Sequence, residues 1–317
     1  MALVTSDFLS ALTTTVRGDF HREYDAAMGV QAWRQLAMVV PATTETISQQ
    51  WLGAVPGMQD VTHSDLKTKD MALFDLTKTD KTWKNGFEVS RRAIEDDSLG
   101  WVPLRVAQLA EEAAAHPGRR LFQQVRDGNT SAVVTFDGSN LFADAHSIGG
   151  QTIDNNLASA GSVAVAIQDG IGAMLEFPDE EGRPMGLSPN VIMVPAELVA
   201  ETYAALNATQ GYLAATTAGG GMGPVIPPAS ANGTWNAAGY TVIANAHLTD
   251  AAAIFMFHVT GSRKPFIFQE RIKPTLEAMD DPQSETGVIR DKFIYSGRAR
   301  NEIYPSDPRY SIRVDLA

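Results

Sequence analysis

Three side chains in one short stretch of the sequence could support hydrolytic or metal chemistry. They are Asp137, Asp144 and His146. Carboxylates and imidazoles are metal ligands, and an imidazole beside a carboxylate can transfer protons. The stretch holds no second histidine, and Asp137 is followed by Gly138, a pair that is common in tight turns. We therefore favour a turn, and keep a hydrolase or metal enzyme using Asp137, Asp144 and His146 as the alternative.

Other catalytic signals in the sequence are weaker still. The chain has no phosphate-binding GxxxxGK[ST] loop, no HExxH pair and no GxSxG serine. The acidic runs at 95–97 and 179–181 are typical of a helix start and of a polar turn. The absence of cysteine excludes disulfides and thiol chemistry. The sequence thus predicts no catalytic residue, no metal site and no cofactor.

The composition is that of a folded globular protein. Of the 317 residues, 44% are hydrophobic and 20% are charged, which argues against a disordered or coiled-coil chain. No apolar run approaches the roughly 18 residues that cross a bilayer, and the first residues lack the features of a signal peptide. The net charge of −12 argues against broad binding to a phosphate backbone, which requires a basic surface.

The elements that would position these residues begin with an amphipathic helix near the start of the chain. An apolar or aromatic residue recurs there every four positions: Phe8, Leu12, Val16, Phe20 and Tyr24. A second amphipathic helix is expected from Pro103 to Gly128, with its apolar stripe at spacings of three and four. Pro117 lies on this stripe and should kink the helix or split it in two.

Residues 61–90 have a different pattern, in which lysines and aspartates alternate with apolar and aromatic residues. The pattern favours two strands that would reach about 40 Å at ~3.3 Å per residue. Such a ribbon has little core of its own and is marginal in isolation. We expect either that it lies on another surface or that it forms the edge of a sheet in the same domain.

The rest of the chain mixes strands and helices, which predicts an α+β fold. The Gly/Pro-rich segment 219–233 is expected to be a long loop. We find no internal repeat. Helices are expected over 162–177 and 196–208, and strands over 132–136, 190–195, 240–243, 252–259, 265–268, 291–298 and 310–316.

Several stretches, in order along the chain, together resemble one family. The sequence is similar to the Mu-like major head subunits, the gpT-like family, over nearly its whole length. The stretches that carry the resemblance are 43–46, 51–58, 87–100, 113–122, 136–146, 264–269 and 297–300.

The resemblance implies the Hong Kong-97-type fold of tailed-phage capsids. Residues 1–60 would form an N-terminal arm and residues 61–92 an extended E-loop. Residues 93–159 and 261–317 would form the peripheral domain, with its spine helix at about 101–127. Residues 160–260 would form the axial domain, with the Gly/Pro loop 219–234 near the capsomer axis.

The same resemblance implies a major capsid protein and not an enzyme. Copies would form pentamers and hexamers that close into an icosahedral shell around double-stranded DNA, without sequence-specific binding and without a membrane. The implied partners beyond the chain itself are a separate scaffold, a portal and, as an optional addition, a decoration protein. The protein would be assembled in the cytoplasm of a bacterial host and end in the virion capsid.

Subunit contacts would then be made by the arm and the E-loop. In the E-loop we expect aromatic side chains as anchors and charged ones as pairs at the rim, because aromatics usually carry interface energy while exposed charges set register. The expected interface residues are Phe8, Leu12, Val16, Phe20, Lys78, Asp80, Lys81, Trp83, Lys84 and Phe87.

Overall fold

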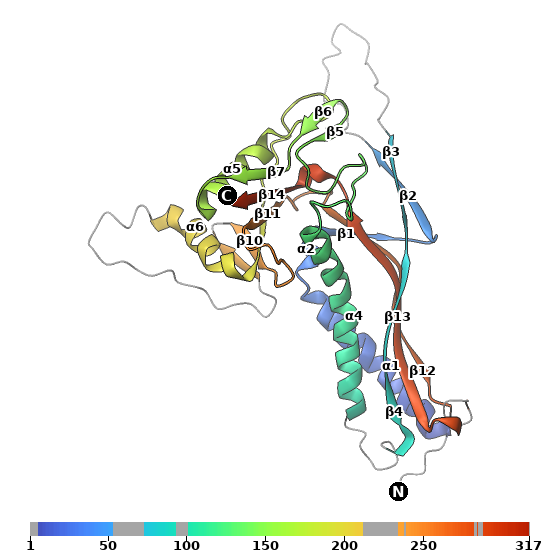
Figure 1. The fold of residues 1–317 in the computed structure, drawn as a ribbon. Coiled ribbons are helices and arrows are strands. Elements are labelled where there is room, and N and C mark those ends of the chain that lie inside the picture. Colours follow the sequence, from blue (N-terminus) through green and yellow to red (C-terminus); the bar gives the residue numbers. More distant parts are fainter. Residues whose placement is uncertain are drawn as a thin grey trace, which may run out of the picture.

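The computed structural model describes residues 6–52, 73–92, 101–211, 234–237, 239–281, 284 and 288–316, with the side chains of 6–12, 47–52, 73–76, 207–211 and 234–237 left undescribed. The chain forms an elongated stem and a wider body (Figure 1). The stem is built on a four-stranded sheet of order β1-β12-β13-β4, and the body on a six-stranded sheet of order β7-β14-β11-β8-β10-β9.

Two long antiparallel strands give the stem its length. They are β12 (Phe266–Met279) and β13 (Lys292–Pro305), each 14 residues long. At ~3.3 Å per residue they extend about 45 Å. Strand β4 (Lys81–Ser90) pairs antiparallel with β13, and β1 (Ala37–Pro41) pairs parallel with β12. Both long strands continue well beyond the expected 265–268 and 291–298.

Two helices cover the stem sheet. Helix α1 (Ser6–Gly29) confirms the amphipathic helix at the start of the chain, and α4 (Trp101–Arg126) confirms the central one. None of the described helices has the length and apolarity that crossing a membrane requires. Residues from both helices and from β12 and β13 share one hydrophobic cluster: Val16, Phe20, Tyr24, Val102, Val106, Leu109, Ala110, Ala114, Leu276, Phe293 and Tyr295.

The apolar stripe of α1 is therefore part of the subunit core. Val16 is 1% exposed and Phe20 is 0% exposed. Within one subunit α4 and the stem sheet already cover these two residues, and their part in a subunit interface stays a prediction. The side chains of Phe8 and Leu12, which were expected on the same stripe, lie outside the described residues.

Helix α4 runs through Pro117 without a break, so the predicted split is wrong. Pro117 is buried beside Gly118, and helix α2 (Trp33–Leu36) places its first residue against this point. A Cβ added at Gly118 would lie 2.8 Å from Cδ1 of Trp33. The glycine is thus needed for the close approach of an indole ring that is itself 1% exposed.

The body buries both faces of its sheet. Its edge strands are β7 (Asn156–Ser159) and β9 (Thr234–Ala237). Between them lie four central strands: β14 (Ser311–Leu316), β11 (Ala253–Phe257), β8 (Val191–Val194) and β10 (Tyr240–Ala244). One core cluster joins this sheet to three helical elements: α5 (Val163–Glu176), the short η2 (Ala196–Leu198) and α6 (Val199–Gly211). A Cβ at Gly170 of α5 would overlap Met256, so this glycine lets the helix lie close to the sheet.

The last strand differs from the expected domain division. Residues 261–317 were expected in the peripheral domain, but β14 lies inside the six-stranded sheet and pairs with β11 and β7. Residues 212–233, which include almost all of the Gly/Pro loop, lie outside the described part of the chain.

The strand expected at 132–136 is also absent; in its place a single bridge joins Val134 and Asn140 around a turn at Gly138, whose φ is +83°. Strands β5 (His146–Ile148) and β6 (Gln151–Ile153) then form a short hairpin.

The two-stranded ribbon lies at a different place in the sequence from the one expected. Strand β2 (Thr46–Leu52) pairs antiparallel with β3 (Leu73–Thr79) in a two-stranded sheet of their own (Figure 1). The two strands were expected within 61–90, but β4 belongs to the stem sheet. Residues 53–72 between β2 and β3 lie outside the described residues. The structure therefore places the two ribbon strands at 46–52 and 73–79, with Asp80 directly after the second strand.

Replacing Phe20 with alanine tests whether α1 packs on its own subunit. The change removes a fully buried ring from the shared cluster of α1, α4 and the sheet, so the free energy of unfolding should fall by about 3 kcal/mol. Urea denaturation followed by circular dichroism measures it. Arg17→Ala, at an exposed site on the same helix, should change stability by no more than about 0.5 kcal/mol. Equal effects of the two variants would mean that α1 is not part of the subunit core.

Candidate functional site

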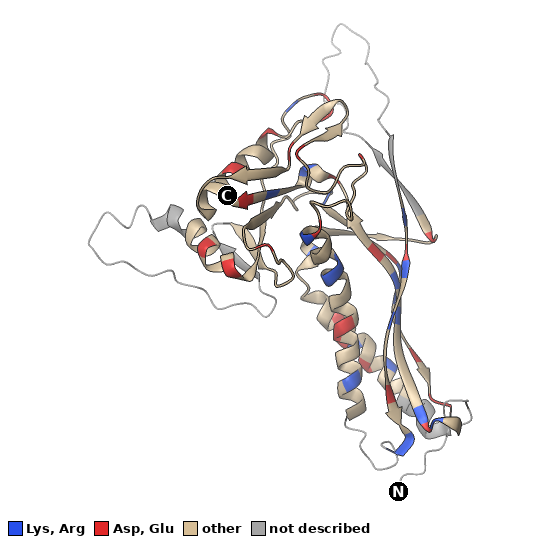
Figure 2. Cartoon of the chain, in the orientation of Figure 1, with Lys and Arg blue, Asp and Glu red and all other residues tan. Residues whose placement is uncertain are grey.

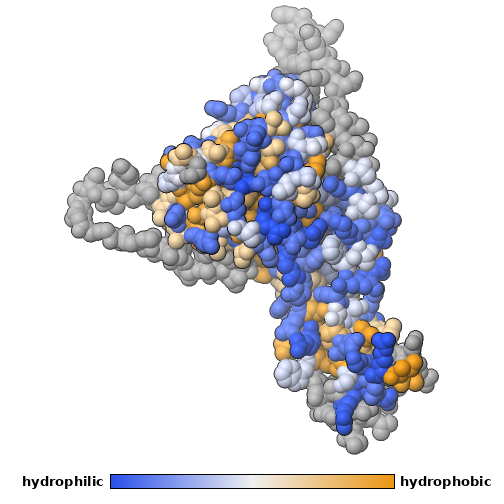
Figure 3. Space-filling model, viewed as in Figure 1, coloured by the Kyte–Doolittle hydropathy of each residue, from blue (hydrophilic) through white to orange (hydrophobic). Residues whose placement is uncertain are grey.

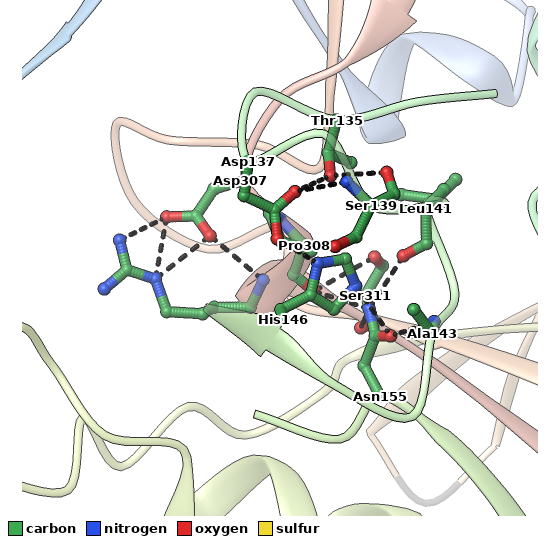
Figure 4. Close-up of polar contacts among 11 residues, drawn as sticks. Thr135, Asp137, Ser139, Leu141, Ala143, His146, Asn155, Asp307, Pro308 and Ser311 are labelled. Carbon is green, nitrogen blue, oxygen red and sulfur yellow. Dashed lines mark hydrogen bonds and ion pairs between the residues drawn. The ribbon is translucent and has the colours of Figure 1, made fainter. Parts of the chain in front are cut away.

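In the described part of the chain, a cluster with the residue types of an active site lies around His146, at the start of β5 (Figure 4). His146 is 0% exposed. Its Nδ1 atom lies 2.7 Å from Oδ2 of Asp137, and its Nε2 atom lies 3.1 Å from Oδ1 of Asn155. A carboxylate and an amide oxygen thus face the two ring nitrogens.

The orientation of Asn155 determines which groups donate in this cluster. Its Nδ2 atom donates to the carbonyl oxygens of Leu141, Pro308 and Ser311 at 2.9, 3.2 and 3.2 Å. Its Oδ1 atom accepts from the N–H of Ala143 at 2.9 Å. A flipped amide would set its donors against that N–H, so the network fixes the orientation. The Nε2 atom of His146 must therefore carry a proton and donate to Oδ1.

Asp137 is the charged partner of this histidine. Its side chain is 2% exposed and accepts hydrogen bonds from Thr135 and, at 3.2 Å, from the N–H of Ser139. Burial alone would raise the pKa of the Asp137 carboxyl. The hydrogen bonds from His146 and Thr135 outweigh burial and hold that pKa below its usual value. Asp137 is therefore an ionised carboxylate at neutral pH.

This arrangement does not suit catalysis or metal binding. Both nitrogens of His146 already face acceptors within the chain, so neither offers a free lone pair to a substrate proton or a metal ion. Asp144, the third member of the alternative, instead accepts a hydrogen bond from Asn156 at 2.9 Å. Among the described residues no group of three or more histidine or carboxylate side chains could hold a metal ion.

The cluster instead ties together segments that are far apart in the sequence. Through Asn155 it joins the turn around Asp137 to the residues that begin β14. Next to it, Asp307 accepts from the guanidinium of Arg309, including a 2.6 Å contact, and both side chains are almost fully buried (Figure 4). These contacts hold the short η3 helix (Pro308–Tyr310) that leads into β14.

A second set of buried charges lies at the root of the ribbon. The side chain of Asp80 is 0% exposed, and it accepts from Arg300 at 2.7 Å and from Arg271 at 3.1 Å. The N–H of Asp80 donates to the carbonyl of Glu45, just before β2. Asp80 was expected among the rim charges of a subunit interface; within one subunit it is buried, and its part in subunit contacts stays a prediction. We call Asp80, Arg271 and Arg300 the ribbon clasp.

The other residues predicted for the E-loop interface lie near the root of the ribbon and along β4. Lys78 lines a hollow beside α4. Lys81 is paired with Glu302 at 3.1 Å, and Lys84 with Glu277 at 3.3 Å. These two pairs lie within one subunit, and their part in subunit contacts stays a prediction. Acidic and basic residues are interspersed along the stem strands (Figure 2).

The two predicted aromatic anchors are half-buried on β4. Trp83 donates from Nε1 to the carbonyl of Asn301 at 3.1 Å, and its ring lies 4.3 Å from that of His116 on α4. Burial, with the nearby charge of Arg119, lowers the pKa of His116 below its usual value, so this imidazole is neutral at pH 7. Phe87 stacks on Tyr295 at 5.5 Å. Both anchors keep part of their surface exposed.

Sequence patterns did not reveal Asn155, Arg271 or Arg300. Their partners lie elsewhere in the chain, and no local motif relates them. The only signal for the clasp was an aspartate between two strand patterns, which is also common in turns.

Asp137→Asn should lower the free energy of unfolding at neutral pH by about 3 kcal/mol, because it removes the carboxylate that His146 and Thr135 bind in a buried network. A carboxyl whose pKa is lowered by folding stabilises the protein above its unfolded pKa and loses that effect as the pH falls through its folded pKa. The difference between wild type and variant should therefore shrink as the pH falls below the ordinary value of 3.8.

Denaturation curves at several pH values measure this difference. Asp144→Asn, at an exposed carboxylate, is the matched control and should follow the wild type at each pH. A difference that grows in acid would show that Asp137 is not held ionised by His146.

The chain is similar in sequence to two curated proteins that form phage heads, by their names. The chain is 27% identical to the major capsid protein of Escherichia phage Mu over 146 residues, which is 46% of each chain. It is 26% identical to the Mu-like prophage FluMu major head subunit of Haemophilus influenzae over 163 residues, which is 51% of each. The matched part thus spans about half the length of these relatives.

A solved structure shows the same fold over a longer range. The procapsid of bacteriophage JBD30 matches 99% of this chain and 77% of its own with a TM-score of 0.57 at 20% identity. The fold is the α+β Hong Kong-97 type of tailed-phage capsids. The sequence pattern of the family described as Mu-like prophage major head subunit gpT matches residues 9–165 and 232–306. Because this match covers most of the chain, the protein belongs to the Mu-like gpT major head subunit family.

Proposed function

We propose that this protein is the major capsid protein of a tailed phage or prophage. Many copies form pentamers and hexamers that close into an icosahedral shell around double-stranded DNA. The observation that carries the proposal is the family match, which extends over the stem, the ribbon and part of the body. The capsid fold over almost the whole chain supports it independently.

The ribbon is the feature of the subunit that best fits assembly. Strands β2 and β3 form a sheet of their own, and a two-stranded ribbon is marginal in isolation. A neighbouring copy can provide the surface that the ribbon lacks. The ribbon clasp fixes the direction in which the ribbon leaves the stem, because two guanidinium groups from β12 and β13 hold one carboxylate at its root.

Assembly by many such contacts needs no single strong one. In a closed ring each subunit contributes and receives the same contact, and each further contact forms at a high effective concentration. We extend the proposal to the partners and the place of assembly: a separate scaffold, a portal and an optional decoration protein, with shells formed in the host cytoplasm.

The charge of the chain fits a container for DNA. It carries 37 acidic against 25 basic residues. Tight binding to the phosphate backbone needs clusters of Lys and Arg. An acidic or neutral inner face would hold DNA by closure of the shell and leave it free to move during packaging and release.

Electron microscopy of the purified full chain tests the proposed function. It should show shells, tubes or rings, whereas a hydrolase or metal enzyme would give only small globules. Asp80→Asn should reduce the yield of particles and lower stability by about 3 kcal/mol, because it leaves two arginines at the ribbon root without their partner.

Glu181→Gln is the matched control, since Glu181 pairs with Arg183 in a turn of the body, where both side chains are partly exposed. It should change stability little and leave assembly intact, because an exposed ion pair contributes little. Normal particles from Asp80→Asn would show that the clasp does not orient the ribbon for assembly.

Duplex DNA should bind weakly or not at all to purified capsomers near physiological salt. The physical reason is the net charge of −12, which disfavours a continuous basic groove on the inner face. Fluorescence anisotropy with labelled DNA at several salt concentrations measures the affinity. Tight binding that weakens steeply as salt is raised would contradict the expectation and indicate a basic surface.

A further inference from the structure

A groove runs along the stem between α4 and β4. Its upper part is a hollow of about 360 Å³ whose floor includes Trp83, Phe87 and Leu109. Its lower part continues past Phe87 and Arg105 to Trp101 and Val102 at the start of α4. Trp101 is 65% exposed, although a tryptophan side chain would bury a large apolar surface if covered. We call this feature the stem groove.

The rim of the stem groove is basic, although the whole chain is acidic. Four cations line its upper part: Lys84, Arg105, Arg119 and Arg298. Three anions accompany them: Glu112 and Glu88 line the groove, and Glu277 lies beside Lys84 and Arg298, so cations still outnumber anions. The neutral His116 adds no charge. The groove therefore suits a partner that is apolar in the centre and acidic at its edges.

The far end of the β12–β13 hairpin has the complementary character. Three large apolar side chains there are exposed: Met279 at 51%, Val288 at 70% and Ile289 at 72%. Asp280 and Asp281 follow Met279 directly. Apolar atoms are visible at this lower end of the stem (Figure 3). We call Met279–Asp281 with Val288 and Ile289 the stem tip.

We propose that the stem tip of one copy docks in the stem groove of a second copy. Val288 and Ile289 would cover the apolar floor beside Trp101 and Phe87, while the acidic residues of the tip would face the basic rim. This inference rests on the proposed function and adds to it a specific contact between subunits. Two different surfaces meet, so the contact is head-to-tail and generates a ring or a chain of copies.

A second copy fits the groove better than the subunit's own tip does. Within one subunit Val288 and Ile289 are the most exposed large apolar side chains that the structure describes, so the tip does not fill its own groove. The two surfaces lie toward the same end of the stem, since Lys292 at the start of β13 pairs with Ser90 at the end of β4 (Figure 1). Copies whose stems meet at a common axis can therefore place each tip against the next groove.

Thiol cross-linking tests the contact directly, because the native chain has no cysteine. The variant Ile289→Cys with Gln108→Cys places one thiol on the tip and one on the exposed wall of the groove. Full-length protein under assembly conditions is treated with a short thiol-to-thiol cross-linker and run on a denaturing gel. A ladder extending beyond the dimer is expected, because each copy can then join two neighbours.

Each single-cysteine variant should stop at the dimer. Ile289→Cys combined with Glu201→Cys is the positional control, since Glu201 is an exposed residue of α6 on the body and should give no ladder. Electron microscopy of each sample records whether particles form.

Particles without a ladder would overturn the tip–groove contact and leave the proposed function standing. Equal ladders in the tip–groove variant and the control would also overturn it, because they would indicate unspecific collisions. A ladder without particles would support the contact and count against the proposed function. If neither particles nor a ladder form, both proposals fail.

Discussion

The packing of helix α4 is the interaction on which the rest of the fold depends. Two hydrophobic clusters, one within the stem and one between stem and body, both contain residues of this helix. Its first half packs with α1 and the stem sheet, around Val106 and Ala110. Its second half, with Leu121 and Val125, joins a cluster that contains Phe255 of the body sheet and Phe266 of the stem sheet. A kink at Pro117 would separate the two halves. The unbroken helix therefore joins stem and body into one packed unit, and Gly118 leaves the space in which Trp33 packs at its middle.

Buried charges fix the segments that leave this unit. The ribbon clasp joins Asp80 to two arginines of β12 and β13, and the Asp137–His146 pair joins a turn to the start of β14 through Asn155. Taking a charge out of water is costly, so each pair is favourable only in one geometry, with all its hydrogen bonds made. Apolar packing tolerates small displacements of a segment, whereas these buried pairs fix the direction in which each segment leaves the core. A fixed direction is what the proposed assembly would require of the ribbon.

The sequence predicted those elements whose signal is local. The stripes of α1 and α4, the strand at 191–194 and the helix at 163–176 follow directly from periodicity. The length of β12 was missed, because its second half turns polar, as in Arg271 and Lys273, where the sheet is less covered. The stripe of α1 indicated that Val16 and Phe20 would be buried but not by what. The clasp and the Asn155 network join residues that are distant in the sequence, and no periodicity records such pairs.

The division between what a subunit stabilises itself and what it leaves open supports assembly as its purpose. Stem and body have continuous cores, and the charges at their joints are paired within one chain. In the described residues β2 and β3 pair only with each other, and the stem groove with Trp101 and the stem tip with Ile289 leave apolar surface exposed. Exposed apolar area of this kind favours association and costs solubility. A chain with a net charge of −12 offsets that cost, because repulsion between free subunits opposes unspecific aggregation. In the proposed contact a basic rim would meet an acidic tip and locally reverse the repulsion, so the charge that keeps free subunits apart would also favour the head-to-tail arrangement.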